Sequence, residues 1–315
     1  MYLRKAESRR TVGAPAKLNL YLEVLGRRDD GYHELETLMV PLQLCDSLSM
    51  APVLPSESGR LGPVHVNVRG AFPLAARDKQ ELPPAGEENL IVRALELLRR
   101  HSGCQLGAEV DLVKRIPLAA GLGGGSSDAA AALSLANRVW GIGWGRERLA
   151  ALAAEVGSDV PFFFAGGPAI CRGRGERVER LPRLRPLHVV IVKPRWGLST
   201  SDVYQALDYQ ALDRQAPAQC GGSERLAGLL QAMRRGAWSE LGRWMGNRLQ
   251  AAAAALLPWV EQAQAAFAQL DFVGHQLAGS GTAYFGVCRQ AQHARRLATI
   301  LRTRQLGLVT VTRSC

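Results

Sequence analysis

Alternation of apolar and polar positions is clearest in the first third of the chain, where it predicts β-strands. Residues 12–25 and 35–48 alternate well enough for strands, and the turn residues 26–31 separate them. Residues 109–116 alternate in the same way until Pro117 stops them. Shorter strands are predicted at 64–68, 169–172 and 177–181.

Apolar residues that recur every three or four positions predict helices in the middle of the chain. Leu90, Ala94 and Leu97 share one face of a helix over 89–100. Further helices are predicted from about 129 to 140 and over 146–156. Beyond these, strands are predicted at 187–193, 273–278, 282–287 and 306–311, and helices at about 201–209, 223–234, 237–256, 258–269 and 290–303.

Length and composition narrow the class of protein. A chain of 315 residues predicts about two domains. Residues 183–187 contain proline and arginine and are the candidate linker, so we expect domains at 1–185 and 186–315. No apolar run approaches the roughly 18 residues of a membrane helix. The six cysteines are scattered and no secretory core is visible, which favours reduced thiols and a cytoplasmic protein.

The net charge of +11 has two interpretations. A basic surface can attract nucleic acid or a membrane, or it can suit anionic small-molecule substrates. The arginines are dispersed, and no aromatic residues are interleaved with them for stacking on single strands. We therefore expect a small-molecule substrate and neither nucleic acid nor a membrane as partner.

A glycine-rich loop between a predicted strand and a predicted helix is the most informative motif. Four of the five residues from Gly121 to Gly125 are glycine, followed by the good capping residues Ser126, Ser127 and Asp128. A helix start presents free N–H groups and a positive dipole end, which suits phosphate. The loop is neither a Walker loop nor a dinucleotide fingerprint. The alternative is a tight turn that only joins strand and helix.

The stretch 117–132 resembles the phosphate-binding motif of the GHMP kinases, which are small-molecule ATP kinases. Residues 15–22 and 30–35 resemble one branch of that family, whose alcohol substrate is linked to cytidine diphosphate, and residues 157–163 and 279–283 agree with it. The resemblance spans residues 15 to 285. It implies a two-domain α/β (α+β) kinase fold, with the active site in the cleft between the domains.

The resemblance implies that ATP, accompanied by Mg²⁺, binds at the glycine loop. No protein ligand is assigned to the metal. Asn89 and Lys114 fall where the family contacts adenosine. The nucleotide-binding residues expected in the loop are Pro117, Ala120, Gly121, Leu122, Gly123, Gly124, Gly125, Ser126 and Ser127.

Two further residues are candidates for catalysis. Asp159 follows a predicted helix, where aspartate often serves only as a turn residue. Lys17 lies in a half-apolar strand, where a surface lysine is the ordinary alternative. The resemblance assigns the catalytic base to Asp159 and places Lys17 close to it, where its charge keeps the carboxylate ionised. Asn19 shares a strand face with Lys17 and resembles a substrate-contacting asparagine.

The resemblance implies a cytidine diphosphate-linked methylerythritol as substrate, and the remaining candidates concern its base. Tyr32 and His33 follow a turn glycine, and the ordinary alternative is that both are packed side chains. In the branch of the family that the sequence resembles, the matching tyrosine stacks on the cytosine and the matching histidine hydrogen-bonds to it. Tyr204 matches the aromatic residue on the opposite side, so that Tyr32 and Tyr204 are expected to sandwich the base. Thr200 matches a nearby polar contact.

The sequence departs from the family pattern in two places. Asn247-Arg-Leu-Gln250 lacks two carboxylates that the family has in this segment, and residues 51–88 look longer than usual. Two alternatives therefore stay open: another GHMP kinase, such as a homoserine or mevalonate kinase, and a non-catalytic nucleotide-binding protein. A monomer and a homodimer are equally compatible with the sequence.

Overall fold

The computed structural model describes residues 9–56, 60–70, 82–84, 86–182, 184–214 and 222–315. Residue 183 of the candidate linker and part of the stretch 51–88 lie outside these ranges. Contacts group the described residues into two compact units. Unit 1 consists of the described residues up to Ala16, Leu44–Leu118 and Gly123–Gly166, and unit 2 of Lys17–Gln43, Ala119–Leu122 and Gly167–Cys315. A contiguous division at residue 185 stays a prediction.

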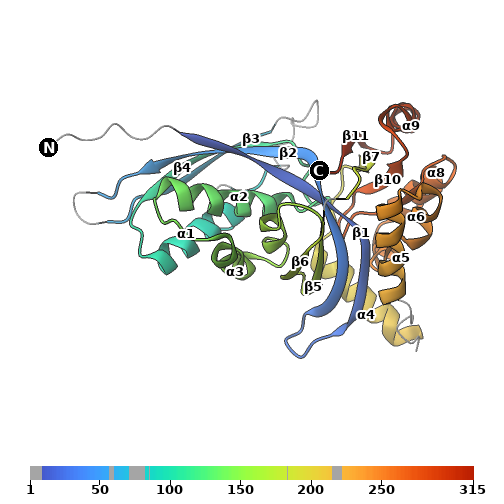
Figure 1. Ribbon diagram of the computed structural model, residues 1–315, viewed down its shortest axis with the longest axis horizontal. Helices are drawn as coiled ribbons and strands as arrows, with labels where there is room; N and C mark the ends of the chain where they lie inside the picture. Colours follow the sequence, from blue (N-terminus) through green and yellow to red (C-terminus); the bar gives the residue numbers. More distant parts are fainter. Residues whose placement is uncertain (1–8, 57–59, 71–81, 85, 183, 215–221) are drawn as a thin grey trace. The chain divides into compact units, whose positions relative to one another are not determined.

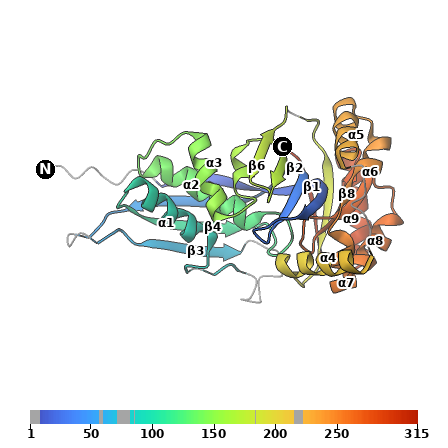
Figure 2. The same ribbon diagram turned by 90° about the horizontal axis from the view of Figure 1, so that it is seen from below.

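Unit 1 is a sheet with helices packed against it. Its strands come from β1 (Arg10–Arg27), β2 (His33–Val53), β3 (Val64–Gly70) and β4 (Gly107–Lys114). Strand β4 pairs in parallel with β3 and antiparallel with the end of β2. The helices of this unit gather on one side of the strands (Figures 1 and 2); they are α1 (Leu90–Ser102), α2 (Gly124–Val139) and α3 (Arg146–Val156).

Small side chains allow α2 to pack closely in the core of unit 1. Ala129, Ala132 and Ala136 are fully buried among leucines and valines of α1, α3 and the strands. The indole N–H of Trp140 donates to the carbonyl of Gly107 at 2.9 Å, so the end of α2 is tied to the start of β4. Alanine has the highest helix propensity, so the same residues favour both the helix and its close packing.

Unit 2 contains a four-stranded antiparallel sheet in the order β11–β7–β10–β9. Its strands are β7 (His188–Lys193), β9 (Gly274–Leu277), β10 (Tyr284–Cys288) and β11 (Leu308–Arg313). A separate hairpin, β5 (Ala169–Gly173) and β6 (Arg177–Arg180), pairs with the first part of β2. The helices are α4 (Thr200–Arg214), α5 (Gly222–Arg235), α6 (Trp238–Trp244), α7 (Gln250–Leu256), α8 (Trp259–Ala268) and α9 (Ala291–Thr303).

The single helix predicted over 237–256 is wrong, because the chain leaves the helix between α6 and α7. Met245 is extended, with φ −63° and ψ 148°, and Gly246 and Asn247 form the short strand β8. This strand pairs in parallel with Tyr21 and Leu22 of β1. A local propensity for helix is thus overridden by pairing with residues more than 200 positions away.

The start of α2 also differs from the expectation. The helix begins at Gly124, so Ser126, Ser127 and Asp128 lie within its first turns instead of capping it. The N-cap is Gly123 in the left-handed region (φ 68°), which glycine adopts without strain. The bare amino end of α2 consequently has no side-chain acceptor for its amides.

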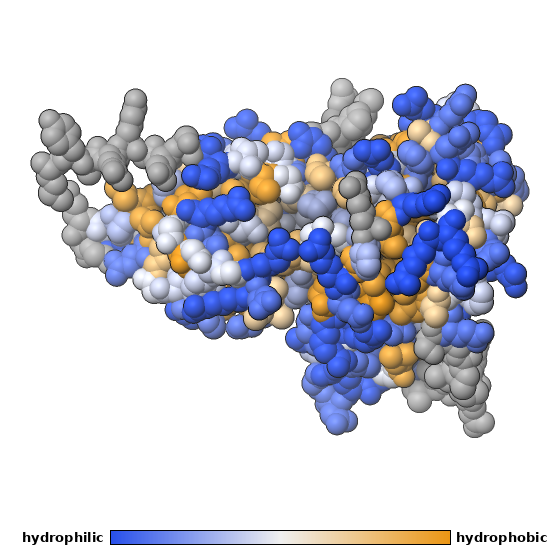
Figure 3. Space-filling view, in the orientation of Figure 1, coloured by the Kyte–Doolittle hydropathy of each residue, from blue (hydrophilic) through white to orange (hydrophobic). Residues whose placement is uncertain are grey.

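Figure 3 shows how hydropathy is distributed over one face. On the face drawn in Figure 3, hydrophilic residues are spread widely, with small apolar areas between them. Among the described residues, no helix has the length and apolar character needed to cross a membrane.

Candidate active site

The glycine loop, residues 117–123, is a half-buried run of backbone that leads into α2. Its backbone takes positive φ at Ala119 (49°), Gly121 (74°) and Gly123 (68°). The first turn of α2 contains no acidic residue, and the cap makes no side-chain hydrogen bond. Amides without internal acceptors and a positive helix end fit an anionic group such as phosphate. The residues present therefore fit the nucleotide expected from the sequence.

A second glycine loop, Gly279–Gly281, packs directly on the first within unit 2. A Cβ added at Gly121 would lie 1.8 Å from the carbonyl oxygen of Ala278, and one added at Gly281 would lie 1.9 Å from the amide of Gly121. The amide of Ala283 donates to the carbonyl of Ala120 at 3.1 Å. Close backbone approach therefore requires glycine at both 121 and 281, and at 121 the positive φ requires it as well.

Lys17 is held in position by a chain of buried polar groups on β1 and β2. Its ammonium donates to the side-chain oxygen of Asn19 at 2.7 Å, and the amide of Asn19 donates to the hydroxyl of Thr37 at 2.8 Å. Thr37 in turn donates to the carbonyl of Tyr21. Lys17 is only 4% exposed, so it is not a surface lysine. Thr37 has no sequence signal of its own, and its role is visible only in the structure.

The second glycine loop lies beside this ammonium. A Cβ added at Gly279 would be 3.3 Å from the Nζ atom of Lys17 and 3.2 Å from the side-chain oxygen of Asn19. The hydroxyl of Ser280 is 2.8 Å from that of Thr200 at the start of α4. Unit 2 thus brings Lys17, Asn19 and Thr200 close to the second glycine loop and to residues 119–122 of the first. Their roles in phosphoryl transfer and substrate binding stay predictions.

The departure at Asn247–Gln250 preserves the contacts that support this loop. The amide of Asn247 donates to the carbonyls of Leu277 and Gly279, at 3.0 and 2.7 Å. The side-chain oxygen of Gln250 accepts the N–H of Leu277 at 2.9 Å. An amide oxygen accepts this bond as a carboxylate would, so the missing charge at position 250 leaves the loop anchored.

Two of the residues expected to bind cytosine lie against each other in unit 2. The ring of His33 stacks on Tyr204, with centroids 4.9 Å apart and planes at 26°. A sandwich of the base between Tyr32 and Tyr204 stays a prediction. The imidazole of His33 also contacts Asp208, with 2.7 Å between Nε2 and Oδ1. Tyr32 is 53% exposed, and its ring faces the guanidinium of Arg174 at 4.8 Å. Sequence reasoning missed Asp208, which lies 175 positions from its partner.

Asp159 occupies a half-buried turn in unit 1. It follows α3 and precedes the 3-10 helix Pro161–Phe164, as expected for an aspartate at the end of a helix. Lys17 belongs to unit 2. The pairing of these two side chains, and the location of the active site in a cleft, therefore stay predictions.

The two residues expected at adenosine have side chains that are already engaged. The side chain of Asn89 caps α1, accepting the N–H of Ile91 at 2.9 Å and donating to the carbonyl of Pro84 at 2.7 Å. Lys114 is fully buried between two aspartates, Asp46 and Asp128. The adenosine role of both residues stays a prediction.

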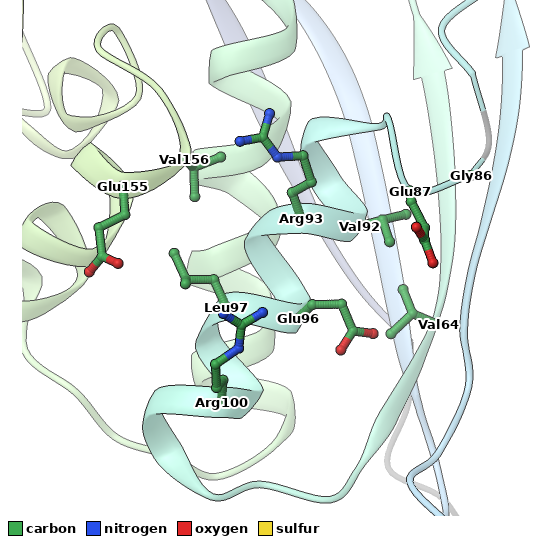
Figure 4. A pocket seen from close by; sticks show the side chains of 10 residues that line it. All are labelled: Val64, Gly86, Glu87, Val92, Arg93, Glu96, Leu97, Arg100, Glu155 and Val156. Carbon is green, nitrogen blue, oxygen red and sulfur yellow. The ribbon is translucent and has the colours of Figure 1, made fainter.

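A surface pocket of about 790 Å³ lies along α1 in unit 1. Figure 4 shows its acidic and basic side chains spread around the pocket instead of meeting at one point. None of the predicted site residues lines it. The lining residues are Val64, Gly86, Glu87, Val92, Arg93, Glu96, Leu97, Arg100, Glu155 and Val156.

The buried Asp128 should make stability depend on pH. Burial raises the pKa of Asp128 to about 7, Lys114 opposes this shift, and the nearby Asp46 adds to it. The folded chain then keeps a proton that the unfolded chain releases near pH 4. The free energy of unfolding should therefore fall as the pH rises from about 4 to about 7. Asp128→Asn should lose this pH dependence. The free energy of unfolding of the variant, relative to that of the unmodified chain, should therefore rise between pH 5 and pH 8.

Urea denaturation at both pH values measures the effect. Glu147→Gln, which removes an exposed carboxylate from the first turn of α3, is the control and should show no such change. If the Asp128→Asn variant and the unmodified chain changed in parallel with pH, Asp128 would not be the group responsible.

Comparison with known proteins gives consistent matches along the chain. Residues 89–167 match the GHMP kinases N terminal domain family, and residues 229–305 match the GHMP kinases C terminal family. The 4-diphosphocytidyl-2-C-methyl-D-erythritol kinase of Pelotomaculum thermopropionicum is 41% identical over 303 residues, covering 96% of this chain and 97% of that protein. The enzyme of the same name from Moorella thermoacetica is 39% identical over 292 residues, covering 92% and 94%.

Solved structures agree with the sequence matches. A crystal structure of 4-(cytidine 5'-diphospho)-2C-methyl-D-erythritol kinase has a TM-score of 0.75 at 34% identity and covers 97% of this chain and 99% of its own. The structure of L. major mevalonate kinase in complex with R-mevalonate has a TM-score of 0.74 at 13% identity, covering 99% and 98%. At such low identity the second match shows a shared fold alone. The mixed α/β arrangement with two sheets is common to both structures.

Proposed function

This chain belongs to the 4-diphosphocytidyl-2-C-methyl-D-erythritol kinase family of GHMP kinases, and we propose that it phosphorylates the 2-hydroxyl of that cytidylyl alcohol with ATP. The products would be the 2-phosphate and ADP, in non-mevalonate isoprenoid precursor biosynthesis. The observation that carries the proposal is 41% identity to a kinase of this name over nearly the full length of both chains. The expectation of an ATP-dependent GHMP kinase with an α/β fold is confirmed.

The amides at the start of α2 would hold the phosphates of ATP. The positive end of a 16-residue helix and the absence of acidic residues in its first turn support this placement. Mg²⁺ would accompany ATP and neutralise charge on the phosphates. The described residues contain no cluster of three His, Cys, Asp or Glu side chains that could hold a metal ion by themselves. We therefore propose that the metal is bound largely through the nucleotide.

Asp159 and Lys17 would act on the transfer itself. The hydroxyl oxygen forms the new bond to the γ-phosphorus as the bond from that phosphorus to the leaving oxygen of ADP breaks. Asp159 would accept the proton that the hydroxyl loses. Lys17 would stabilise the negative charge on the transferring group. Burial of Lys17 and its hydrogen bond to Asn19 support this role, because they fix the position of the ammonium.

The aromatic cluster of unit 2 would bind the cytosine. The contact between His33 and Asp208 orients the imidazole, and the stack on Tyr204 fixes the plane of the ring. Tyr32 precedes His33 in the sequence and is half exposed, so its ring offers a face for stacking. Flat rings and an oriented hydrogen-bonding group suit a pyrimidine base and have no counterpart to bind in homoserine or mevalonate.

An ADP-release assay with purified protein tests the proposed function. ATP is supplied with the cytidylyl methylerythritol, with homoserine or with mevalonate. We expect ADP formation only with the first, accompanied by a new phosphomonoester on the methylerythritol part detected by phosphorus NMR. ADP formation with homoserine or mevalonate instead would assign the chain to another GHMP kinase activity.

Replacing Tyr32 should affect binding of the alcohol more than turnover. Stacking on a base contributes about 1–3 kcal/mol, so Tyr32→Ala should raise the KM for the cytidylyl substrate about ten-fold or more. The KM for ATP should be unchanged. Tyr209→Ala, which removes a comparably exposed tyrosine (65%) from α4, is the matched control. An unchanged KM for the cytidylyl substrate in Tyr32→Ala would count against base stacking at this position.

A further inference from the structure

Unit 1 buries three ionisable side chains beside the start of α2 that have no part in the transfer described above. Lys114 is fully buried, and Asp46 and Asp128 are 1% and 3% exposed. The ammonium of Lys114 donates to Oδ2 of Asp128 at 2.7 Å and is ion-paired with Asp46. Taking charges out of water is costly, and a buried ion cluster is weak evidence for added stability. Stability alone therefore does not account for this cluster.

The cluster connects the two ends of the glycine loop. Asp46 accepts the backbone N–H groups of Arg115 and of Ile116, the latter at 2.8 Å, and these are the last residues before the loop. Asp128 lies in the first turns of α2, directly after the loop. Because Lys114 contacts both aspartates, the residues before and after the loop are fixed to each other and to β2.

The helix start lies in close contact with the ammonium. A Cβ added at Gly124 would be 3.2 Å from the Nζ atom of Lys114 and 3.0 Å from a methyl carbon of Ile116. Gly124 is the first residue of α2, and its neighbours supply the free amides of the helix start. The position of these amides is therefore set by packing of the backbone on Lys114 and Ile116.

We propose that Lys114, Asp46 and Asp128 are positioning residues, which hold the amides at the start of α2 where the phosphates of the nucleotide bind. The inference rests on the proposed function, since it assumes that a nucleotide binds there. Donors that are fixed in advance need no reorganisation when the anion binds. This role also differs from the adenosine contact that the resemblance implies for Lys114, and the two make different predictions.

Calorimetric titration of the Lys114→Met variant with AMP-PNP and, separately, with adenosine tests the proposal. Misplacement of a binding group by about 1 Å can cost about 100-fold, so the affinity for AMP-PNP should fall at least about ten-fold. The affinity for adenosine, which has no phosphate, should change less than about two-fold. Equal losses for both ligands would overturn the proposal in favour of an adenosine contact. Unchanged AMP-PNP affinity in a folded variant would also overturn it.

Asn137→Ala is the matched control for loss of a polar anchor on α2. Asn137 binds the backbone of Trp144 through both its amide nitrogen and its oxygen, at 3.0 and 2.8 Å, near the other end of the helix. We expect this variant to lose stability without losing affinity for AMP-PNP.

Lys114→Met leaves two buried carboxylates without their cation, and this can prevent folding. The triple variant Lys114→Met/Asp46→Asn/Asp128→Asn is neutral at these positions. The same titrations with AMP-PNP and adenosine are made on it, with the same expected results. Relative to the unmodified chain, the triple variant should also speed amide hydrogen exchange more in the first two turns of α2 than near the other end of the helix; an equal change along α2 would contradict positioning. If the unmodified chain failed to bind AMP-PNP, the proposed function would fall, and this inference with it; failure of the inference alone leaves that binding intact.

Discussion

Asp159→Asn should lower kcat by about 100-fold or more, because a general base contributes about 10² to 10⁴ to a proton transfer. Asparagine has nearly the same shape as aspartate but cannot accept the proton that the substrate hydroxyl loses. The glycine loop is unchanged in this variant, so the KM for ATP should stay within about two-fold of the original value. Steady-state assays with saturating cytidylyl substrate give both quantities.

The control for this experiment is Asp202→Asn, which removes an exposed carboxylate in the first turn of α4. It should leave kcat unchanged. Near-normal turnover in Asp159→Asn would remove Asp159 from its catalytic role and return it to the alternative of a turn residue. A large rise in the KM for ATP without a fall in kcat would point instead to nucleotide binding.

The second large effect is expected at Gly121, where both conformation and space require glycine. A residue other than glycine at φ 74° costs about 1–2 kcal/mol, and overpacking against backbone costs about 1–3 kcal/mol more. A Cβ there would lie 1.8 Å from the carbonyl oxygen of Ala278, which cannot be relieved by a side-chain rotation. Gly121→Ala should therefore lower the free energy of unfolding by about 2–5 kcal/mol and displace one glycine loop from the other.

Gly141→Ala is a closely matched control, since Gly141 has a similar φ of 70° but no atom within 4 Å of its added Cβ. It bears only the conformational cost, about 1–2 kcal/mol. Urea denaturation of both variants separates the two contributions. Equal destabilisation in the two variants would mean that the contact between the glycine loops contributes little.

Local sequence pattern predicted the elements whose stability is local. Helix α3 begins and ends where its pattern does, because Gly157 stops it, and α1 begins after its cap Asn89. Strand β4 was predicted from its alternation of apolar and polar residues, with Pro117 marking the end of the pattern, and it lies within two residues of the predicted range. The glycine loop is recognisable because its composition allows few other structures.

Features that depend on distant residues were not predictable in this way. The strand β8 interrupts a helical pattern only because β1 offers it a pairing edge. Asp208 and Asp46 gain their roles from partners far along the chain, namely His33 and Lys114. No local pattern marks an aspartate that will be buried beside a cation.

A crystal structure of this chain with AMP-PNP, Mg²⁺ and the cytidylyl methylerythritol tests the central claim most directly. We predict that the phosphates of the nucleotide bind the amides at the start of α2. We also predict that the carboxylate of Asp159 lies within hydrogen-bonding distance of the 2-hydroxyl, with the Lys17 ammonium beside the γ-phosphate. Phosphates bound away from α2, or an Asp159 side chain directed away from the hydroxyl, would contradict the account.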